Sequence, residues 1–123
     1  MGMYIIGRPK DPYPDAVVEA LKRAVSGVHG VAEAHIPQLF MAGKTPMPEQ
    51  TLIIVPGAGH EEVRLMKDVM DAVHRELPEG PDVPAMLVRG DESMAKAVRE
   101  AGCQIFQSET MQAAVRRWWQ VWK

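Results

Sequence analysis

The stretch Thr51–Pro56, with the sequence TLIIVP, decides which fold we expect for this chain. Its four central residues are all apolar, so the segment has no polar face that could turn toward water. A run of this length, bounded by Pro48 and by Pro56-Gly57, is too short for a helix and is typical of a strand covered on both sides. We therefore expect it to be the central strand of a sheet, with amphipathic helices packed over it.

Two segments that flank this strand have the periodicity of amphipathic helices. After Pro14, which suits a first helical position, apolar residues recur every three or four positions until Gly27 ends the pattern. The segment His60–Leu77 repeats at the same spacing. Its predicted core-facing residues are Val63, Met66, Met70, Val73 and Leu77.

Short β-rich segments complete the pattern. We predict strands at residues 3–7, 31–41 and 85–88, and Pro37 should make the second of these an edge strand or a bulge because proline has no N–H for the ladder. The resulting order, β-α-β-β-α-β, is the split βαβ or ferredoxin-like pattern, in which the first and third strands lie in the middle of an antiparallel sheet. An α-β-α extension over residues 91–123 should cover an edge or the open face of this α+β fold.

The length and charge of the chain narrow the class of protein. Its 123 residues fit a single domain, residues 1–123, that can bury a core without a disulfide or a metal. The net charge of −2 argues against broad electrostatic binding to nucleic acid or to an anionic membrane. Cys103 is the only cysteine, which excludes an internal disulfide, and no apolar run approaches the roughly 20 residues of a membrane span. We therefore expect a cytoplasmic protein.

Packing and turn residues along most of the chain form a further pattern. It comprises Gly7, Pro9, Tyr13-Pro14, Leu21, Val31, Ala34, the strand that ends near Gln38, the strand Leu52–Val55, and the segment from Leu77-Pro78 to Val88. Over residues 4–107 this pattern resembles the C-terminal domain of the SseB family (enhanced serine sensitivity protein). The resemblance implies a bacterial, non-enzymatic protein-binding domain without a cofactor, in the manner of immunity or adaptor proteins of secretion and toxin systems.

The turn after the central strand argues against a phosphate site. Gly57-x-Gly59 follows a strand and opens a helix, as phosphate-binding loops do. However, Glu61 and Glu62 occupy the first helical turn, and two carboxylates at a helix start repel a phosphate group. We therefore expect no nucleotide or other phosphate cofactor at this turn.

The spacing of the histidines argues against a metal site. The four histidines are His29, His35, His60 and His74. No two of them lie four residues apart on one predicted helix, and the zinc-protease pattern that would begin at His60 has Arg64 where a second histidine is needed. We therefore predict no metal ligands.

Three residues, His35, Ser93 and Cys103, are candidates for a small-molecule-binding or catalytic domain. Ser93 lacks the G-x-S-x-G spacing of a nucleophile elbow, and Cys103 would need a neighbouring base that the sequence does not place. We predict no catalytic residue. The alternative function would require a pocket between the sheet and the C-terminal helix in which titratable groups converge.

The chain end and one loop carry the best candidates for partner binding. Trp118 and Trp122 share a stripe of a predicted terminal helix, which should dock on the domain. Trp119 lies about 100° away around the helix, beside Arg116, and Trp and Arg are enriched at interface hot spots. Met47 is a flexible apolar residue on a proline-rich loop. The predicted partner-binding residues are Met47, Arg116, Trp119 and Trp122, and the predicted partner is another protein or a second copy in a homodimer, not nucleic acid or membrane.

Overall fold

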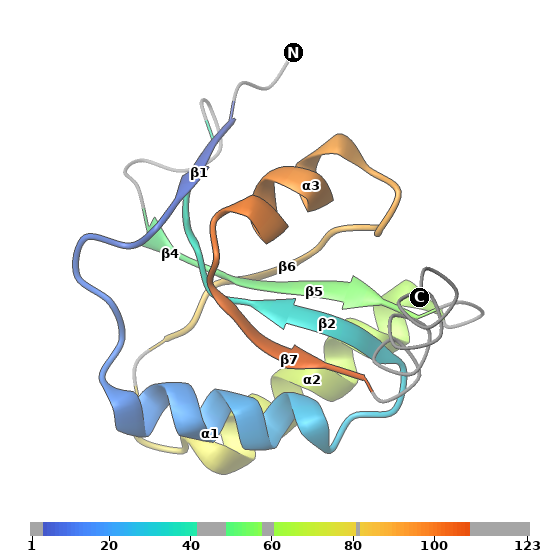
Figure 1. Ribbon diagram of the computed structural model, residues 1–123. Helices are drawn as coiled ribbons and strands as arrows, with labels where there is room; N and C mark the ends of the chain where they lie inside the picture. The colour runs from blue at the N-terminus through green and yellow to red at the C-terminus, as the bar shows by residue number, and fades with distance from the viewer. Residues whose placement is uncertain (1–3, 42–48, 58–60, 81, 109–123) are drawn as a thin grey trace, which may run out of the picture.

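The structure, a computed structural model, describes residues 4–41, 49–57, 61–80 and 82–108. These residues form three helices and two β-sheets (Figure 1). The elements in chain order are β1 (Tyr4–Gly7), α1 (Asp15–Ser26), β2 (Val31–His35), β3 (Gln38–Met41), β4 (Glu49–Gln50), β5 (Leu52–Pro56), α2 (Glu62–Glu76), β6 (Ala85–Leu87), α3 (Ser93–Glu100) and β7 (Gln104–Gln107).

The predicted central strand is confirmed as β5, an inner strand of the larger sheet. This sheet has the strand order β6-β5-β2-β7, and β5 pairs antiparallel with β2 and parallel with β6. The side chains of Leu52, Ile53 and Ile54 are all 0% exposed. Because neighbouring residues of a strand point to opposite faces, this burial requires cover on both faces of the sheet.

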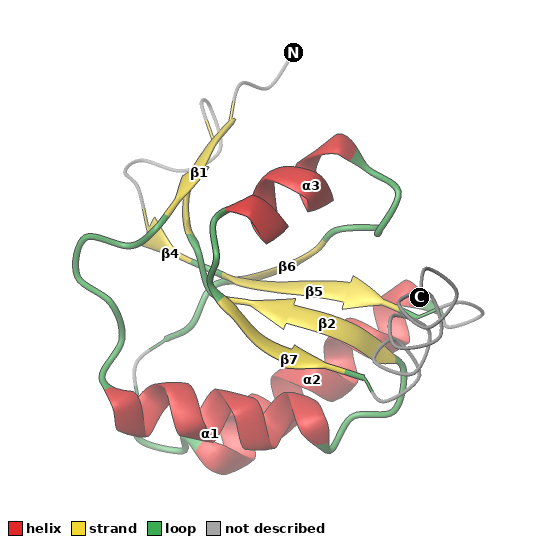
Figure 2. Ribbon diagram, in the orientation of Figure 1, coloured by secondary structure: helices red, strands yellow, loops and turns green. Residues whose placement is uncertain are grey.

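Helices α1 and α2 provide the cover on one face, as Figure 2 shows. α1 buries Leu21 and Val25, α2 buries Leu65 and Val69, and the two helices pack against each other and against Ile54 of the sheet. In both helices apolar residues recur at the helical period, so each helix has one apolar face, and this face is buried against the sheet and the other helix.

The predicted core face of α2 is partly wrong. Its buried residues are Leu65, Val69, Ala72 and Val73, whereas Val63 is 77% exposed. Met66 and Met70 are half-buried at the border between the two faces. The buried stripe of α2 is therefore displaced around the helix from the predicted one. The helix has apolar residues at several positions around its axis, so more than one stripe is possible, and the packing against α1 and the sheet selects between them.

The second face of the larger sheet is covered by α3 and by the smaller sheet. Ile53 of β5 and Val88 pack there against Ala95 and Val98 of α3. Leu39 of β3 joins the same apolar cluster. The smaller sheet has the order β1-β3-β4 with antiparallel pairs.

Pro37 marks the point at which the chain passes from one sheet to the other. The predicted strand at 31–41 is two strands, with β2 in the larger sheet and β3 in the smaller one. The backbone groups at this corner are satisfied, since Pro37 O accepts from Thr51 N at 2.9 Å and Ile36 N donates to Cys103 O at 3.0 Å. Proline at this corner costs no ladder hydrogen bond.

The fold is α+β as predicted, but the ferredoxin-like topology is not confirmed. β1 pairs with β3 in the smaller sheet and not with β5 in the middle of the larger one. In the predicted arrangement β1 would lie between β5 and β6, but β5 pairs directly with β6 and its other edge is taken by β2. β7 of the predicted extension instead joins the sheet at the outer edge of β2.

Candidate functional site

A polar cluster of the buried residues Glu33 and His35 and the partly exposed Arg99 joins β2 to α3. Glu33 and His35 lie two positions apart on β2, so both project from the face that α3 covers. Their side chains are 4% and 1% exposed. Arg99 Nε donates to Glu33 Oε1 at 3.0 Å and Arg99 Nη2 donates to Glu33 Oε2 at 2.7 Å, a two-point ion pair of the strong kind. His35 Nε2 lies 3.0 Å from Glu33 Oε1.

The electrostatics of this cluster define its protonation states. The hydrogen bonds from Arg99 hold the pKa of Glu33 below its ordinary value, so this carboxylate is charged and can only accept hydrogen bonds. Burial lowers the pKa of His35, which favours a neutral ring, and Nε2 must then carry the proton that it donates to Glu33. The same ion pair raises the pKa of Arg99.

The chemistry open to this cluster is limited by its burial. His35 Nδ1 is an acceptor that no hydrogen-bond donor meets within the described part of the chain, yet the atom is out of contact with solvent. A general base must come within hydrogen-bond reach of its substrate. The two hydrogen bonds from Arg99 to Glu33 therefore tie α3 to the larger sheet.

The three sequence candidates for catalysis do not converge. Ser93 is exposed at the first residue of α3, Cys103 is half-buried just before β7, and His35 is enclosed in the polar cluster. Burial raises the pKa of the Cys103 thiol, and the positive charge of Arg8 opposes this effect only in part. Among the residues that the structure describes, no three His, Cys, Asp or Glu side chains gather where they could hold a metal ion.

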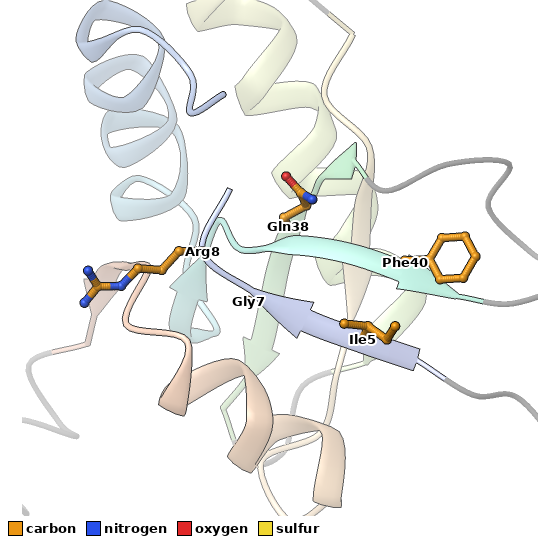
Figure 3. A pocket seen from close by; sticks show the side chains of 5 residues that line it. All are labelled: Ile5, Gly7, Arg8, Gln38 and Phe40. Atoms are coloured by element: carbon orange, nitrogen blue, oxygen red, sulfur yellow. The ribbon is translucent and has the colours of Figure 1, made fainter. Parts of the chain in front are cut away.

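An apolar pocket lies on the outer face of the smaller sheet (Figure 3). It has a volume of about 470 Å³ and is lined by Ile5, Gly7, Arg8, Gln38 and Phe40. Ile5 and Phe40 are direct partners across β1 and β3, as are Gly7 and Gln38. Ile5 is 63% exposed, although an aliphatic side chain in water is unfavourable. Figure 3 shows Ile5 and Phe40 side by side and the Arg8 side chain directed away from them.

A second hollow, which we call the basic groove, lies between the start of β7 and the segment that precedes α1. Its volume is about 500 Å³. Arg8 and Lys22 contribute its positive charges, and Cys103 lies in its wall. Arg8 lines both the groove and the apolar pocket, so the two hollows adjoin.

The predicted partner-binding residues Met47, Arg116, Trp119 and Trp122 lie outside the described residues. His35 is a candidate that the sequence predicts, whereas its partners Glu33 and Arg99 are not. The spacing of Glu33 and His35 on a strand could have indicated that they share a face, whereas nothing in the sequence pairs Glu33 with Arg99, 66 positions away. The pair Ile5 and Phe40 is not predicted either, since only the pairing of β1 with β3 brings these residues together.

Comparisons with known proteins yield no relative. No protein-family model matches the chain, and neither a curated protein nor a solved structure matches it. None of the helices in the described ranges is both long enough and apolar enough to cross a membrane.

Proposed function

We propose that this chain is a non-enzymatic protein-interaction domain that binds its partner through the outer face of the smaller sheet. The observation that carries this proposal is the exposure of Ile5, at 63%, beside its cross-strand partner Phe40. Aliphatic and aromatic side chains that meet on an exposed face are typical of interfaces. The sequence resemblance to the SseB C-terminal domain favours the same class, with an immunity or adaptor protein as its specific form.

The polar chemistry of the domain supports binding over catalysis. The cluster of Glu33, His35 and Arg99 is closed by its own ion pair, and the candidate nucleophiles Ser93 and Cys103 belong to other parts of the surface. The alternative, a small-molecule-binding or catalytic domain, needs titratable groups that converge in a cleft. The described residues offer less support for it than for an apolar contact face.

The experiment compares variants of the apolar pocket with a matched exposed position. Ile5→Glu places a charge on the contact face, and Gly7→Val adds a side chain in the pocket, where a Cβ at position 7 meets no atom within 4 Å. The control is Val63→Glu, which changes another exposed aliphatic residue, 77% exposed on α2. Each variant is used as bait in cell extract, and its self-association is measured by sedimentation.

We expect the wild-type protein and Val63→Glu to retain the same partner or the same dimer, and Ile5→Glu and Gly7→Val to lose it. An unchanged set of partners in all four proteins would show that binding occurs elsewhere. A wild-type monomer that recovers no partner at all would count against the interaction function itself.

A further inference from the structure

We infer that the basic groove receives a carboxylate of an acidic segment of a protein partner, and that Arg8 is the residue that binds this carboxylate. The class of occupant rests on the proposed function, whereas the preference for a carboxylate stands on the groove itself. The inference adds a second subsite to the surface that begins at Ile5 and Phe40.

One of the two cations that line the groove has no acidic partner. Among the described residues, Arg8 and Lys22 line the groove and no Asp or Glu does, but Lys22 Nζ pairs with Glu19 at 3.2 Å, so Arg8 carries the uncompensated positive charge. Arg23, Arg89 and Arg99 each form an ion pair with a glutamate. Within the described residues Arg8 forms neither a hydrogen bond nor an ion pair, so its guanidinium keeps its donors for a ligand.

The groove is preformed by hydrogen bonds that hold its walls. Gln50 accepts from Tyr13 N at 2.8 Å, its backbone oxygen accepts from the Tyr13 hydroxyl at 3.0 Å, and its amide donates to Ile36 O at 2.9 Å. Pro9 and Pro12, which line the groove, have a fixed φ. Because these walls are already ordered, binding does not incur the entropy loss of ordering them.

The position of Arg8 favours a protein segment as the occupant. Arg8 directly follows β1 and lines both hollows, and its side chain points away from Ile5 and Phe40 (Figure 3). A segment that covers the apolar pair can therefore continue past Arg8 into the groove. The walls near Arg8 also carry apolar side chains, among them Ile36 and Ile105, which suits a segment that combines acidic and aliphatic residues.

Cys103 supplies a probe that is built into the groove. It is the only cysteine, so iodoacetate and iodoacetamide each give one product, in which a C–S bond forms and iodide leaves. The two reagents differ in charge, one a carboxylate and the other a neutral amide. Since the same thiolate attacks both reagents, the ratio of their rates does not depend on the pKa or the exposure of Cys103.

We expect the rate ratio, iodoacetate over iodoacetamide, to fall about fivefold in Arg8→Gln, the Boltzmann factor of about 1 kcal/mol for two unit charges 4 Å apart in water. Arg8→Lys should keep most of the wild-type ratio, and Arg89→Gln, at an arginine elsewhere on the surface, should keep all of it. High salt should reduce the wild-type ratio toward that of Arg8→Gln. Equal ratios in the wild type and Arg8→Gln, with both proteins folded by circular dichroism, would overturn the inference.

A second arm identifies the occupant through protection of Cys103 from iodoacetamide. The probes are a peptide of alternating valine and glutamate, the same peptide with glutamine in place of glutamate, and hexanoate. We expect protection by the glutamate peptide alone, with loss of this protection in Arg8→Gln. Equal protection by hexanoate would assign the groove to a small carboxylate, and protection by neither peptide would exclude an acidic segment. The alkylation test needs no partner, so a rate ratio that depends on Arg8, together with no partner in the extract experiment, would overturn the proposed function alone.

Discussion

Arg99 of α3 and Glu33 of β2 meet in a two-point ion pair, with Nη2 at 2.7 Å from Oε2 and Nε at 3.0 Å from Oε1. The two residues are 66 positions apart, and this pair is a polar contact within an otherwise apolar junction between α3 and the larger sheet. The glutamate is buried and the arginine side chain is 41% exposed, so the guanidinium bridges the interior and the solvent.

Removal of Arg99 should destabilise the protein, because Glu33 would remain charged and buried without its main partner. We expect Arg99→Gln to lower the free energy of unfolding by about 1–3 kcal/mol, the cost of a buried polar group left unsatisfied. The matched control is Arg89→Gln, whose ion pair with Glu62 is exposed and should contribute at most about 1 kcal/mol. Urea denaturation of the three proteins measures both values, and an equal loss in the two variants would contradict the assignment.

Stability should decrease as the pH falls below neutral. Burial lowers the pKa of His35, whose ordinary value is 6.5, so near and below this pH the unfolded chain takes up a proton that the folded chain does not. The unfolded state then binds more protons and is favoured. The contribution of His35 is complete above pH 6.5 and is lost as the pH falls toward its lowered pKa.

Glu33 adds a second acid-sensitive step at lower pH. Its pKa is held below the ordinary value of 4.5, so its contribution is complete above this pH and is lost as the pH falls through the lowered pKa. Urea denaturation between about pH 7.5 and 5.5 isolates the histidine step. In this range His35→Gln should flatten the pH dependence, and a variant profile parallel to that of the wild type would exclude His35 as its source.

Substitutions of one buried and one exposed aliphatic residue test which side chains form the core. Ile53 of β5 is 0% exposed and faces α3. Ile53→Ala should lower the free energy of unfolding by about 2–5 kcal/mol, because apolar burial is lost and a cavity remains. Val63, which the helical pattern assigned to the core, is 77% exposed, and Val63→Ala should change stability by less than about 0.5 kcal/mol. Thermal melting distinguishes the two variants. A melting temperature of Val63→Ala well below that of the wild type would support the predicted core position of Val63.

Replacing Gly102 and Gly7 with alanine should have different effects on stability. Gly102 follows α3 with φ at +72°, a conformation in which a Cβ is strained, so Gly102→Ala should cost about 1–2 kcal/mol. Gly7 has no positive φ and open space at its Cβ position, so Gly7→Ala should be neutral or slightly stabilising. Chemical denaturation checks both, and similar losses at the two positions would contradict the backbone explanation for Gly102.

The sequence alone determined the elements that depend on local patterns. The apolar run of β5 has no polar face, so a buried inner strand follows from its composition. Pro14 and Gly27 lie directly before and after α1, as the local pattern predicts, although Gly27 has a φ of −86° and does not use the left-handed conformation open to glycine. Pro37 does interrupt its segment as predicted, but neither resulting strand is an edge strand, since β2 lies between β5 and β7 and β3 lies between β1 and β4. These features depend on neighbouring residues, which is why a pattern in the chain predicts them.

Only the tertiary structure decided how the elements combine. β1 was predicted beside β5 in the larger sheet, but β5 pairs with β6 and β2, and β1 pairs with β3 in the smaller sheet. Local periodicity does not show which strands, distant in the chain, will pair. The candidate sites depend on the same long-range choices. Ile5 becomes an exposed contact residue because its strand joins the smaller sheet, and Glu33 can be buried as a charge because Arg99 arrives from α3 to neutralise it.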